Sequence, residues 1–420
     1  MNETVLNKVK ILAESAKYDV SCASSGTSRS HKAGNIGSAA GWGICHSFAE
    51  DGRCISLLKI MLTNHCMYDC AYCINRRSND IPRATLAVSE LIDLTIEFYR
   101  RNYIEGLFLS SGVVRNPDYT MERLVRIVKD LRQVHRFNGY IHMKSIPGAS
   151  RELVHEAGLY ADRLSVNIEI PNEKSLQLLA PEKNFQSVLT PMRYIQQGVL
   201  ESGEEHRKYR SAPRFAPAGQ STQMIVGATD DSDKDILYLS AALYKRSSMK
   251  RVYYSGFIPV NAYDQRLPML KQPPLVRENR LYQADWLLRF YEFKANEIVD
   301  DSFPDLDLEI DPKLAWALRH PEKFPVDVNR ADYEMLLRIP GLGVKSAKMI
   351  LVSRRYGRIG TSQLKKMGVV LKKAQYFITC NELTCKTVNE IKPEKVRQIL
   401  TQKTNKKEDP QQLKIIFEGE

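Results

Sequence analysis

The sequence predicts an α/β protein with a parallel sheet, followed by an all-α C-terminal region. Over residues 54–262, short apolar runs alternate with amphipathic segments in six β/α repeats. Repeats of this kind form parallel sheets with right-handed crossovers. Residues 328–357 then show two helical segments joined by a Pro-Gly-Leu-Gly turn, which is the pattern of an αα-hairpin.

The six apolar runs are the predicted strands, at residues 55–62, 106–110, 140–145, 163–170, 223–228 and 251–255. Helices are predicted between them, at residues 88–100, 121–134, 150–157 with Gly158 as the C-cap, 174–197 and 232–243. The first run, ISLLKIML, is nearly all apolar, as expected of a strand buried on both faces.

Two of the predicted strands have one polar face. Ser165, Asn167 and Glu169 alternate with apolar residues in the fourth run, and His142 and Lys144 do so in the third. In a barrel wrapped by helices, such polar faces point into the lumen. A strand with one solvated face, as in antiparallel sheets, is the alternative.

The bulk composition is that of a two- or three-domain protein. The 420 residues include 61 Lys and Arg against 49 Asp and Glu, a net charge of +12 that favours an anionic partner. No apolar run approaches the ~18 residues of a membrane span, and no signal-peptide pattern is present. We expect a cytoplasmic location and no membrane partner. The eight cysteines therefore favour metal binding or redox chemistry over disulfides.

Three cysteines, Cys66, Cys70 and Cys73, follow the first predicted strand with the spacing C-x3-C-x2-C. Cysteine thiolates are the usual ligands of iron–sulfur clusters. Three of them leave one iron of a four-iron cluster without a protein ligand, and an open position is typical of metal sites that do chemistry. A structural zinc site is the alternative, with His65 or an upstream cysteine as fourth ligand.

The N-terminal extension contains a predicted helix at residues 5–16 and then glycine- and serine-rich loops. Cys22, Cys45 and Cys54 lie in this part of the chain. They either bind a second cluster, or place a thiol near a reactive centre, or are small buried apolar residues.

The cysteine spacing, its place after the first strand, and Tyr72 directly before the last cysteine resemble the radical S-adenosylmethionine (radical SAM) superfamily. The resemblance implies a partial (β/α)6, TIM-like barrel and a [4Fe–4S] cluster bound by the three cysteines. It also implies that S-adenosyl-L-methionine (SAM) chelates the open iron, with Tyr72 beside the cofactor.

The same resemblance suggests where SAM is held. Many radical SAM proteins carry a Gly-Gly-Glu segment after the second strand, which binds the amino group of SAM. This sequence has Ser110, Ser111 and Gly112 there, without the glutamate. The predicted cofactor-binding residues are these three together with Tyr72, Ser165, Asn167 and Glu169.

The αα-hairpin resembles the helix-hairpin-helix DNA-binding motif. Free amides of Gly341, Gly343 and Val344 are expected at the start of the second helix, flanked by Lys345 and Lys348. A helix N-terminus with free N–H groups suits a phosphate, so binding is expected to be sequence-independent and salt-dependent. A weaker second hairpin is predicted at residues 364–377. A helical packing module with solvated lysines is the alternative.

Over nearly its whole length, from residues 18–22 (YDVSC) to the hairpin, the chain resembles a family of radical SAM proteins described as acting in DNA modification or repair. That resemblance implies a 5′-deoxyadenosyl radical that abstracts hydrogen from DNA, and it favours duplex DNA as the partner. It also implies an electron donor such as a flavodoxin or ferredoxin. A radical SAM enzyme that modifies tRNA or other RNA, and a non-catalytic iron–sulfur DNA-binding protein, are the alternatives.

The predicted organisation has five parts. They are an N-terminal extension (residues 1–53), the barrel (54–262), a proline-rich connector with helices (263–325), the helix-hairpin-helix domain (326–385) and a charged tail (386–420). Within the connector, one helix is expected at residues 281–298 and another after an Asp311-Pro312 start.

Overall fold

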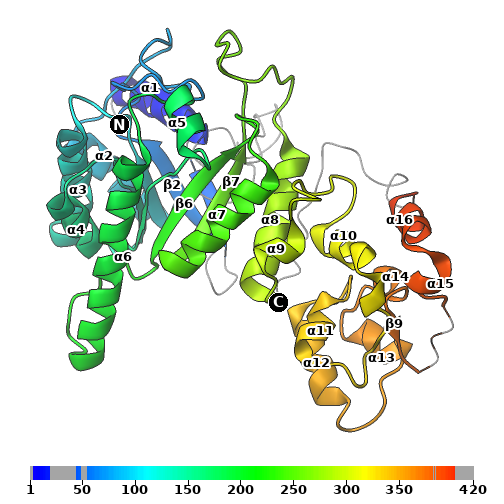
Figure 1. Cartoon of the computed structure of the whole chain (residues 1–420). Helices are drawn as coiled ribbons and strands as arrows, with labels where there is room; N and C mark the ends of the chain where they lie inside the picture. Colours follow the sequence, from blue (N-terminus) through cyan, green and yellow to red (C-terminus); the bar gives the residue numbers. More distant parts are fainter. Residues whose placement is uncertain (1–2, 19–43, 49–53, 382, 384, 403–420) are drawn as a thin grey trace, which may run out of the picture. The chain divides into compact units, whose positions relative to one another are not determined.

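The computed structural model describes residues 3–18, 44–48, 54–381, 383 and 385–402, and these form two compact units (Figure 1). The first unit comprises residues up to 231 together with 242–274, and the second comprises 232–241 and the chain from 275 onward. Cys22 and the tail beyond residue 402 lie outside the described residues, as does the side chain of Cys54.

A seven-stranded sheet forms the centre of the first unit, with the strands in sequence order from β1 to β7. Its strands are β1 (Ile44–Phe48), β2 (Cys54–Met61), β3 (Gly106–Ser110), β4 (Tyr140–Lys144), β5 (Arg163–Ser165), β6 (Gln220–Val226) and β7 (Met249–Gly256). All pairs from β2 to β7 are parallel, and the sheet is an open half-barrel, because β7 does not pair with β1. The predicted parallel β/α sheet is confirmed.

The first strand, β1, was not predicted. It pairs antiparallel with β2, with Ile44 opposite Leu58 and Phe48 opposite Cys54. The glycine- and serine-rich loops were predicted for residues 21–43, which lie outside the described residues. Pairing along the otherwise free edge of β2 satisfies backbone hydrogen bonds of both segments, and this long-range effect leaves no local pattern in a short edge strand.

The helices of the first unit are α1 (Glu3–Ser15), α2 (Val88–Arg100), α3 (Pro117–Gln133), α4 (Arg151–Tyr160), α5 (Glu173–Leu179) and α6 (Phe185–Lys208), with a short 3-10 turn at Ala16–Tyr18. Helix α7 (Asp233–Arg246) crosses the boundary between the units. Helices α2, α3, α4 and α6 pack side by side in that order, and α1 packs against β2 (Figure 1).

Two sequence predictions in this unit need correction. Gly158 does not end α4, which continues to Tyr160; a Cβ at Gly158 would lie 2.1 Å from the ring of Phe215, so the glycine makes room for that ring. The fourth predicted strand is also shorter than expected. The chain leaves the ladder after Ser165; further on, Glu169 has a φ of +63° and pairs with Met224 of β6 through an isolated bridge.

The second unit is mainly helical. Its helices are α8 (Leu275–Phe290), α9 (Ala295–Ile298), α10 (Pro312–Arg319), α11 (Tyr333–Arg338), α12 (Val344–Ser353), α13 (Thr361–Lys366), α14 (Leu371–Ala374), α15 (Val388–Ile391) and α16 (Pro393–Gln402), with a 3-10 turn at Pro321–Lys323. A small parallel pair, β8 (Val326–Asp327) and β9 (Ile378–Thr379), completes it. None of the described helices is long and apolar enough to cross a membrane.

Two predictions for this unit can be compared with the structure. The Asp311-Pro312 start is confirmed, because the Asp311 side chain caps α10 by accepting from the amide of Leu314. The single helix expected at residues 281–298 is two helices, and Glu292 between them has a left-handed φ of +58°. Residues 388–402, placed in the tail, form α15 and α16.

Candidate active site

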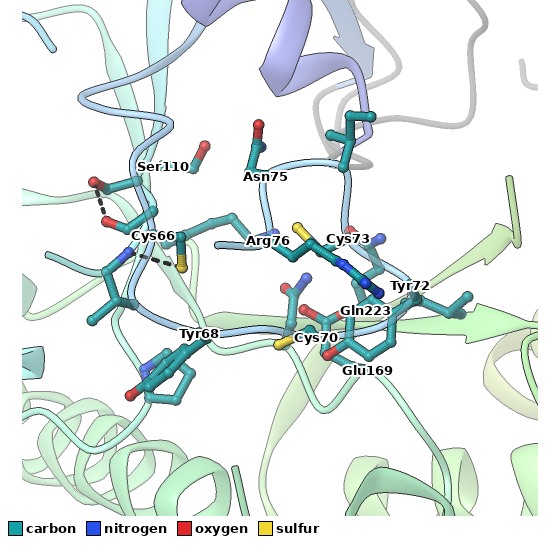
Figure 2. A pocket seen from close by; sticks show the side chains of 18 of the residues that line it. Cys66, Tyr68, Cys70, Tyr72, Cys73, Asn75, Arg76, Ser110, Glu169 and Gln223 are labelled. Carbon is teal, nitrogen blue, oxygen red and sulfur yellow. Dashed lines mark hydrogen bonds between the residues drawn. The ribbon is translucent and has the colours of Figure 1, made fainter. Parts of the chain in front are cut away.

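A cavity opens at the carboxyl ends of strands β2 to β7, and Cys66, Cys70 and Cys73 all line it. Figure 2 shows their three sulfur atoms arranged around a common space. Of the other residues predicted to bind the cofactor, six line the same cavity: Tyr72, Ser110, Ser111, Gly112, Asn167 and Glu169. The carboxyl ends of barrel strands are where chemistry gathers in such folds.

Ser165 is the predicted residue that does not line the cavity. Its Oγ lies 2.9 Å from Nε2 of His142 on the neighbouring strand, and both side chains are buried. Burial, reinforced by the charges of Arg163 and Lys144, holds the pKa of His142 well below its usual range. The imidazole is therefore neutral, and this pair packs the lumen beneath the cavity.

One arginine shapes the loop that carries the cysteines. The Arg83 guanidinium donates to four main-chain carbonyls of this loop, those of Asn64, Asn75, Arg76 and Asn79, at 2.5–2.9 Å. These carbonyls come from both ends of the loop. A planar group with five donors suits such a role, since one side chain can fix several acceptors at once.

The segment after β7 holds the same loop from the other side. Asn261 is 1% exposed, and its amide donates to the carbonyls of Ala71 at 2.6 Å and Cys73 at 3.0 Å. Asp264 accepts from Arg76 at 2.6 Å and is paired with Arg266 at the same distance. Hydrogen bonds from both guanidiniums, first that of Arg266, keep the pKa of Asp264 well below its usual value despite desolvation.

Gly112 brings the end of β3 against the cysteine loop. Its amide donates to the carbonyl of Thr63 at 2.8 Å, and an added Cβ would lie 2.2 Å from the carbonyl oxygen of His65. Only glycine permits this approach. The next residue, Val113, points its amide at Sγ of Cys66 at 3.5 Å, and an N–H directed at a ligand sulfur is one of the groups that tune a cluster's reduction potential.

The donor set fits a cluster better than a single ion. Ligands of one zinc lie about 2.3 Å from it, which brings their sulfurs within about 4 Å of one another. Among the residues described here, no three His, Cys, Asp or Glu side chains are grouped closely enough to hold one metal ion. Three thiols that line one cavity match the three protein ligands of a [4Fe–4S] cluster and leave one iron open.

Cys70 is buried, and Cys73 and Lys183 near it are partly buried. Burial raises the pKa of Cys73 to about 12, and it also raises that of Cys70, so these thiols become thiolates by binding metal. Lys183 lies over Tyr72, with Nζ 3.4 Å from the phenol oxygen. Burial disfavours its charge, but the charges of Cys70, Tyr72 and Glu169 outweigh this and hold the pKa of Lys183 above its usual range.

Two buried polar atoms in the wall of the cavity have no hydrogen-bond partner among the described residues. They are Oδ1 of Asn75 and Oγ of Ser110, whose residues are 6% and 3% exposed. Both residues line the cavity, and Figure 2 shows their polar ends on the same side of it. Buried polar groups are normally satisfied, so a ligand that donates hydrogen bonds is expected there.

Sequence reasoning missed several residues of this site. Asn75 follows Cys73 by two positions and could have been included on proximity alone. Gln223 was visible as a polar residue in an apolar strand, and it lines the cavity. Lys183 and Asn261 reach the site from distant segments, whereas Arg83 follows Cys73 by ten positions; the local sequences of all three carry no signal of the site.

A second candidate site lies on the hairpin of the second unit. Gly341 has a left-handed φ of +80°, Gly343 is the N-cap of α12 without a side-chain cap, and Lys345 and Lys348 are exposed. Within the described chain, no acceptor takes the amides of Gly343, Val344 or Lys345. The free amides and the exposed lysines lie where the sequence predicted a phosphate site.

The weaker hairpin predicted at residues 364–377 is formed by α13 and α14, and it packs against the first. The amide of Val370 donates to the carbonyl of Gly341 at 2.8 Å, and the hydroxyl of Ser346 donates to that of Met367 at 2.7 Å. Gly368 has a φ of +81°, nearly that of Gly341. The two turns therefore lie back to back as a pair.

Lys313 supports the first turn from inside. It is 8% exposed, donates to the carbonyl of Leu342 at 2.5 Å and lies 4.6 Å from the ring centroid of Tyr291. Burial lowers its pKa to about 7, although Asp311 opposes this.

The lowered pKa of Lys313 predicts a pH dependence of stability. Between about pH 7 and the unfolded value near 10.4, the unfolded chain binds one more proton than the folded one. The free energy of unfolding is therefore expected to rise from pH 7 to pH 9, by up to about 1.4 kcal/mol per pH unit. Denaturant titrations of Lys313→Met should show a flatter profile, while the exposed Lys372→Met should follow wild type. Parallel profiles for Lys313→Met and wild type would refute this.

The fold and the first site together define an α/β half-barrel protein with a thiol-lined cavity at the carboxyl ends of its strands. Residues 60–199, or 140 of the 420 residues, match the family model of the Radical SAM superfamily, and this segment contains all three cysteines. Members of that superfamily are enzymes that bind a [4Fe–4S] cluster and SAM, and the match covers the segment that forms most of the candidate site.

Several solved structures are similar to the chain. The FeFe-hydrogenase maturase HydG from Carboxydothermus hydrogenoformans is 17% identical over 47% of this chain (TM-score 0.38). Methylornithine synthase PylB is 15% identical over 55% of this chain, with a TM-score of 0.40. Coproporphyrinogen III oxidase HemN from Escherichia coli is 14% identical over 61% of this chain, with a TM-score of 0.33. The chain spans 44%, 60% and 56% of their respective lengths. A search of curated protein sequences gave no match.

Proposed function

We propose that this protein is a radical SAM enzyme that binds a [4Fe–4S] cluster through Cys66, Cys70 and Cys73 and modifies or repairs DNA. The observation that carries the cluster assignment is the loop itself. Its three thiols line one cavity, and Arg83, Asn261 and Gly112 fix its main chain from three sides. When bound and reduced, the cluster and SAM supply a 5′-deoxyadenosyl radical. The chain supplies orientation and exclusion of water.

The residues of the cavity suit the parts of SAM. Oδ1 of Asn75 and Oγ of Ser110 are free acceptors for its ammonium group, in place of the missing glutamate. Lys183 offers a cation for its carboxylate, and Asn167 and Glu169 offer polar groups for its ribose. The strained backbone of Glu169, at a φ of +63°, accords with a functional role, because such strain gathers at binding sites.

Formation of 5′-deoxyadenosine tests the radical chemistry. The anaerobically reconstituted protein, reduced with dithionite and given SAM, is expected to release this product, detected by mass spectrometry. A non-catalytic iron–sulfur protein would release none, and that result would refute the proposal. The assay is then repeated with a panel of damaged duplexes and with tRNA. A change in the mass of one of these nucleic acids, measured by mass spectrometry, identifies it as the substrate.

The paired hairpins support DNA as the substrate. Free amides at the start of α12, flanked by Lys345 and Lys348, are the features with which a helix N-terminus binds backbone phosphate. A duplex held on the same chain raises the concentration of target bases near the barrel. A base must still leave the stack to enter a cavity.

Replacing Lys345 and Lys348 together with alanine is expected to weaken duplex binding and to flatten its salt dependence. Each phosphate contact contributes about 0.9 to the slope of log K against log salt, so the slope should fall by about 2. Fluorescence anisotropy at several salt concentrations measures this. The double variant Lys245→Ala with Lys250→Ala removes the same charge from exposed positions outside the hairpins and should retain the slope. An unchanged slope in the hairpin variant would make the hairpin a packing element.

A further inference from the structure

An aromatic residue stands beside the cysteine cavity in a fixed and exposed position. Tyr263 lies on the segment after β7 and is 67% exposed. Its neighbours Asn261 and Asp264 bind the cysteine loop, as described above. Tyr263 differs from other exposed tyrosines, such as Tyr209, in that its segment is anchored to the cysteine loop.

The ring of Tyr263 is held before any ligand arrives. Its hydroxyl donates to Oδ1 of Asn79 at 2.5 Å, and Asn79 is anchored in turn, because its amide donates to the carbonyl of Ile74 and to Oδ1 of Asn261, both at 2.8 Å. The guanidinium of Arg76 lies over the ring, 5.3 Å from its centroid. A ring held this way loses little conformational entropy when a ligand stacks on it.

Arg76 connects this ring to the cavity. Its side chain is only 7% exposed, is fixed by Asp264 at 2.6 Å and Ser78 at 2.8 Å, and lines the cavity together with the cysteines. Ile258, 41% exposed, lines the same cavity and adds apolar surface. The platform formed by Tyr263 on Arg76 thus borders the place where radical chemistry is proposed.

We infer that the Tyr263–Arg76 platform stacks an unpaired nucleobase of the substrate at the entrance of the cavity. This inference rests on the proposed function, because it takes the ligand to be a nucleic acid. Every base has a π-face, so stacking on an aromatic side chain tolerates any sequence, and a cation beneath the ring adds attraction. An unpaired base held here is outside the helical stack and next to the cluster cavity.

The test compares two oligonucleotide duplexes on the reconstituted protein under anaerobic conditions. One carries a single bulged 2-aminopurine, and the other carries the same base fully paired. Wild type is expected to bind the bulged duplex more tightly and to change its 2-aminopurine fluorescence. Tyr263→Ala should lose about 5- to 150-fold in affinity for the bulged duplex, while affinity for the paired duplex stays unchanged. Tyr263→Phe keeps the ring and should stay within about 3-fold of wild type.

Tyr209→Ala is the matched control, because Tyr209 is 68% exposed and lies at the C-terminal end of α6. It should bind both duplexes as wild type does. Equal affinity of wild type and Tyr263→Ala for the bulged duplex would overturn the platform while leaving duplex binding and SAM cleavage intact. Failure of wild type to bind either duplex would overturn both the platform and the DNA substrate. If a tryptophan-containing peptide binds to wild type and no oligonucleotide competes with that peptide, the inference would likewise be overturned in favour of a protein substrate.

Discussion

The Cys70→Ala variant is expected to retain little of its cluster after anaerobic reconstitution and to lose SAM cleavage by about 100-fold or more. Substitution of residues that hydrogen-bond to a metal ligand already lowers metal affinity or activity by about 10–100-fold, and removal of the ligand itself lowers it at least as much. Cys70 is 4% exposed and packs in a small apolar cluster with Ala71 and Leu179, so alanine fills most of its place and the fold should persist. Iron content, the cluster's absorbance and EPR spectrum, and 5′-deoxyadenosine formation measure the result.

Two other cysteines make this experiment specific. Cys385, in the second unit, bonds only weakly to the carbonyl of Lys386, and Cys385→Ala should keep full iron and full activity. Cys45→Ala tests a second cluster, which is one of the alternatives that the sequence leaves open for Cys22, Cys45 and Cys54. Lower iron content than wild type, with SAM cleavage retained, would support a second cluster, and unchanged iron content would favour a packing role. Full iron content and SAM cleavage in Cys70→Ala would contradict the cluster assignment.

The sequence was sufficient for features that depend on local pattern. Strand β3 and helix α2 have the predicted bounds, and the parallel order follows from the β/α alternation. The cysteine spacing and the Pro-Gly-Leu-Gly turn of the hairpin could likewise be recognised from the sequence. Each strand, helix, spacing and turn named here is encoded in one short stretch of sequence, and the parallel order follows from the repetition of such stretches.

The features that the sequence did not reveal depend on contacts between distant segments. The sequence around Gly158 is typical of a helix end, but in the structure the missing side chain of Gly158 leaves room for the ring of Phe215. Phe215 lies more than fifty positions later in the chain. Arg83 and Asn261 shape the cysteine loop by donating to main-chain carbonyls, and any loop has carbonyls, so no residue pattern marks the acceptors. The alternation at Ser165, Asn167 and Glu169 was seen, but it does not tell how deep each side chain lies: Ser165 pairs with His142 on the neighbouring strand, and only Asn167 and Glu169 line the cavity.

The Gly112→Ala variant is expected to lose the cluster although it removes no ligand. The added methyl would lie 2.2 Å from the carbonyl oxygen of His65 and 3.3 Å from Cβ of Cys66. Real Cβ contacts are not that short, so the main chain before the first cysteine must move. Arg83 and Asn261 restrain the rest of the loop, so the shift falls on Cys66 and on the amide of Val113 that points at its sulfur. A ligand displaced by about 1 Å no longer meets its iron, since metal–ligand distances tolerate about 0.2 Å.

The glycine at position 203 supplies the control for this steric argument. Gly203 is exposed on α6, and a Cβ there meets nothing within 4 Å, so Gly203→Ala should keep its iron and gain up to about 1 kcal/mol in stability from helix propensity. Gly112→Ala should instead show reduced iron content, a changed EPR signal and a lower melting temperature of the reconstituted protein. Its far-UV circular dichroism should stay close to wild type, because the sheet itself is untouched. If Gly112→Ala reconstitutes with full iron and an unchanged EPR spectrum, the contact between the end of β3 and the cysteine loop does not position the cluster, and ligation depends on the cysteines alone.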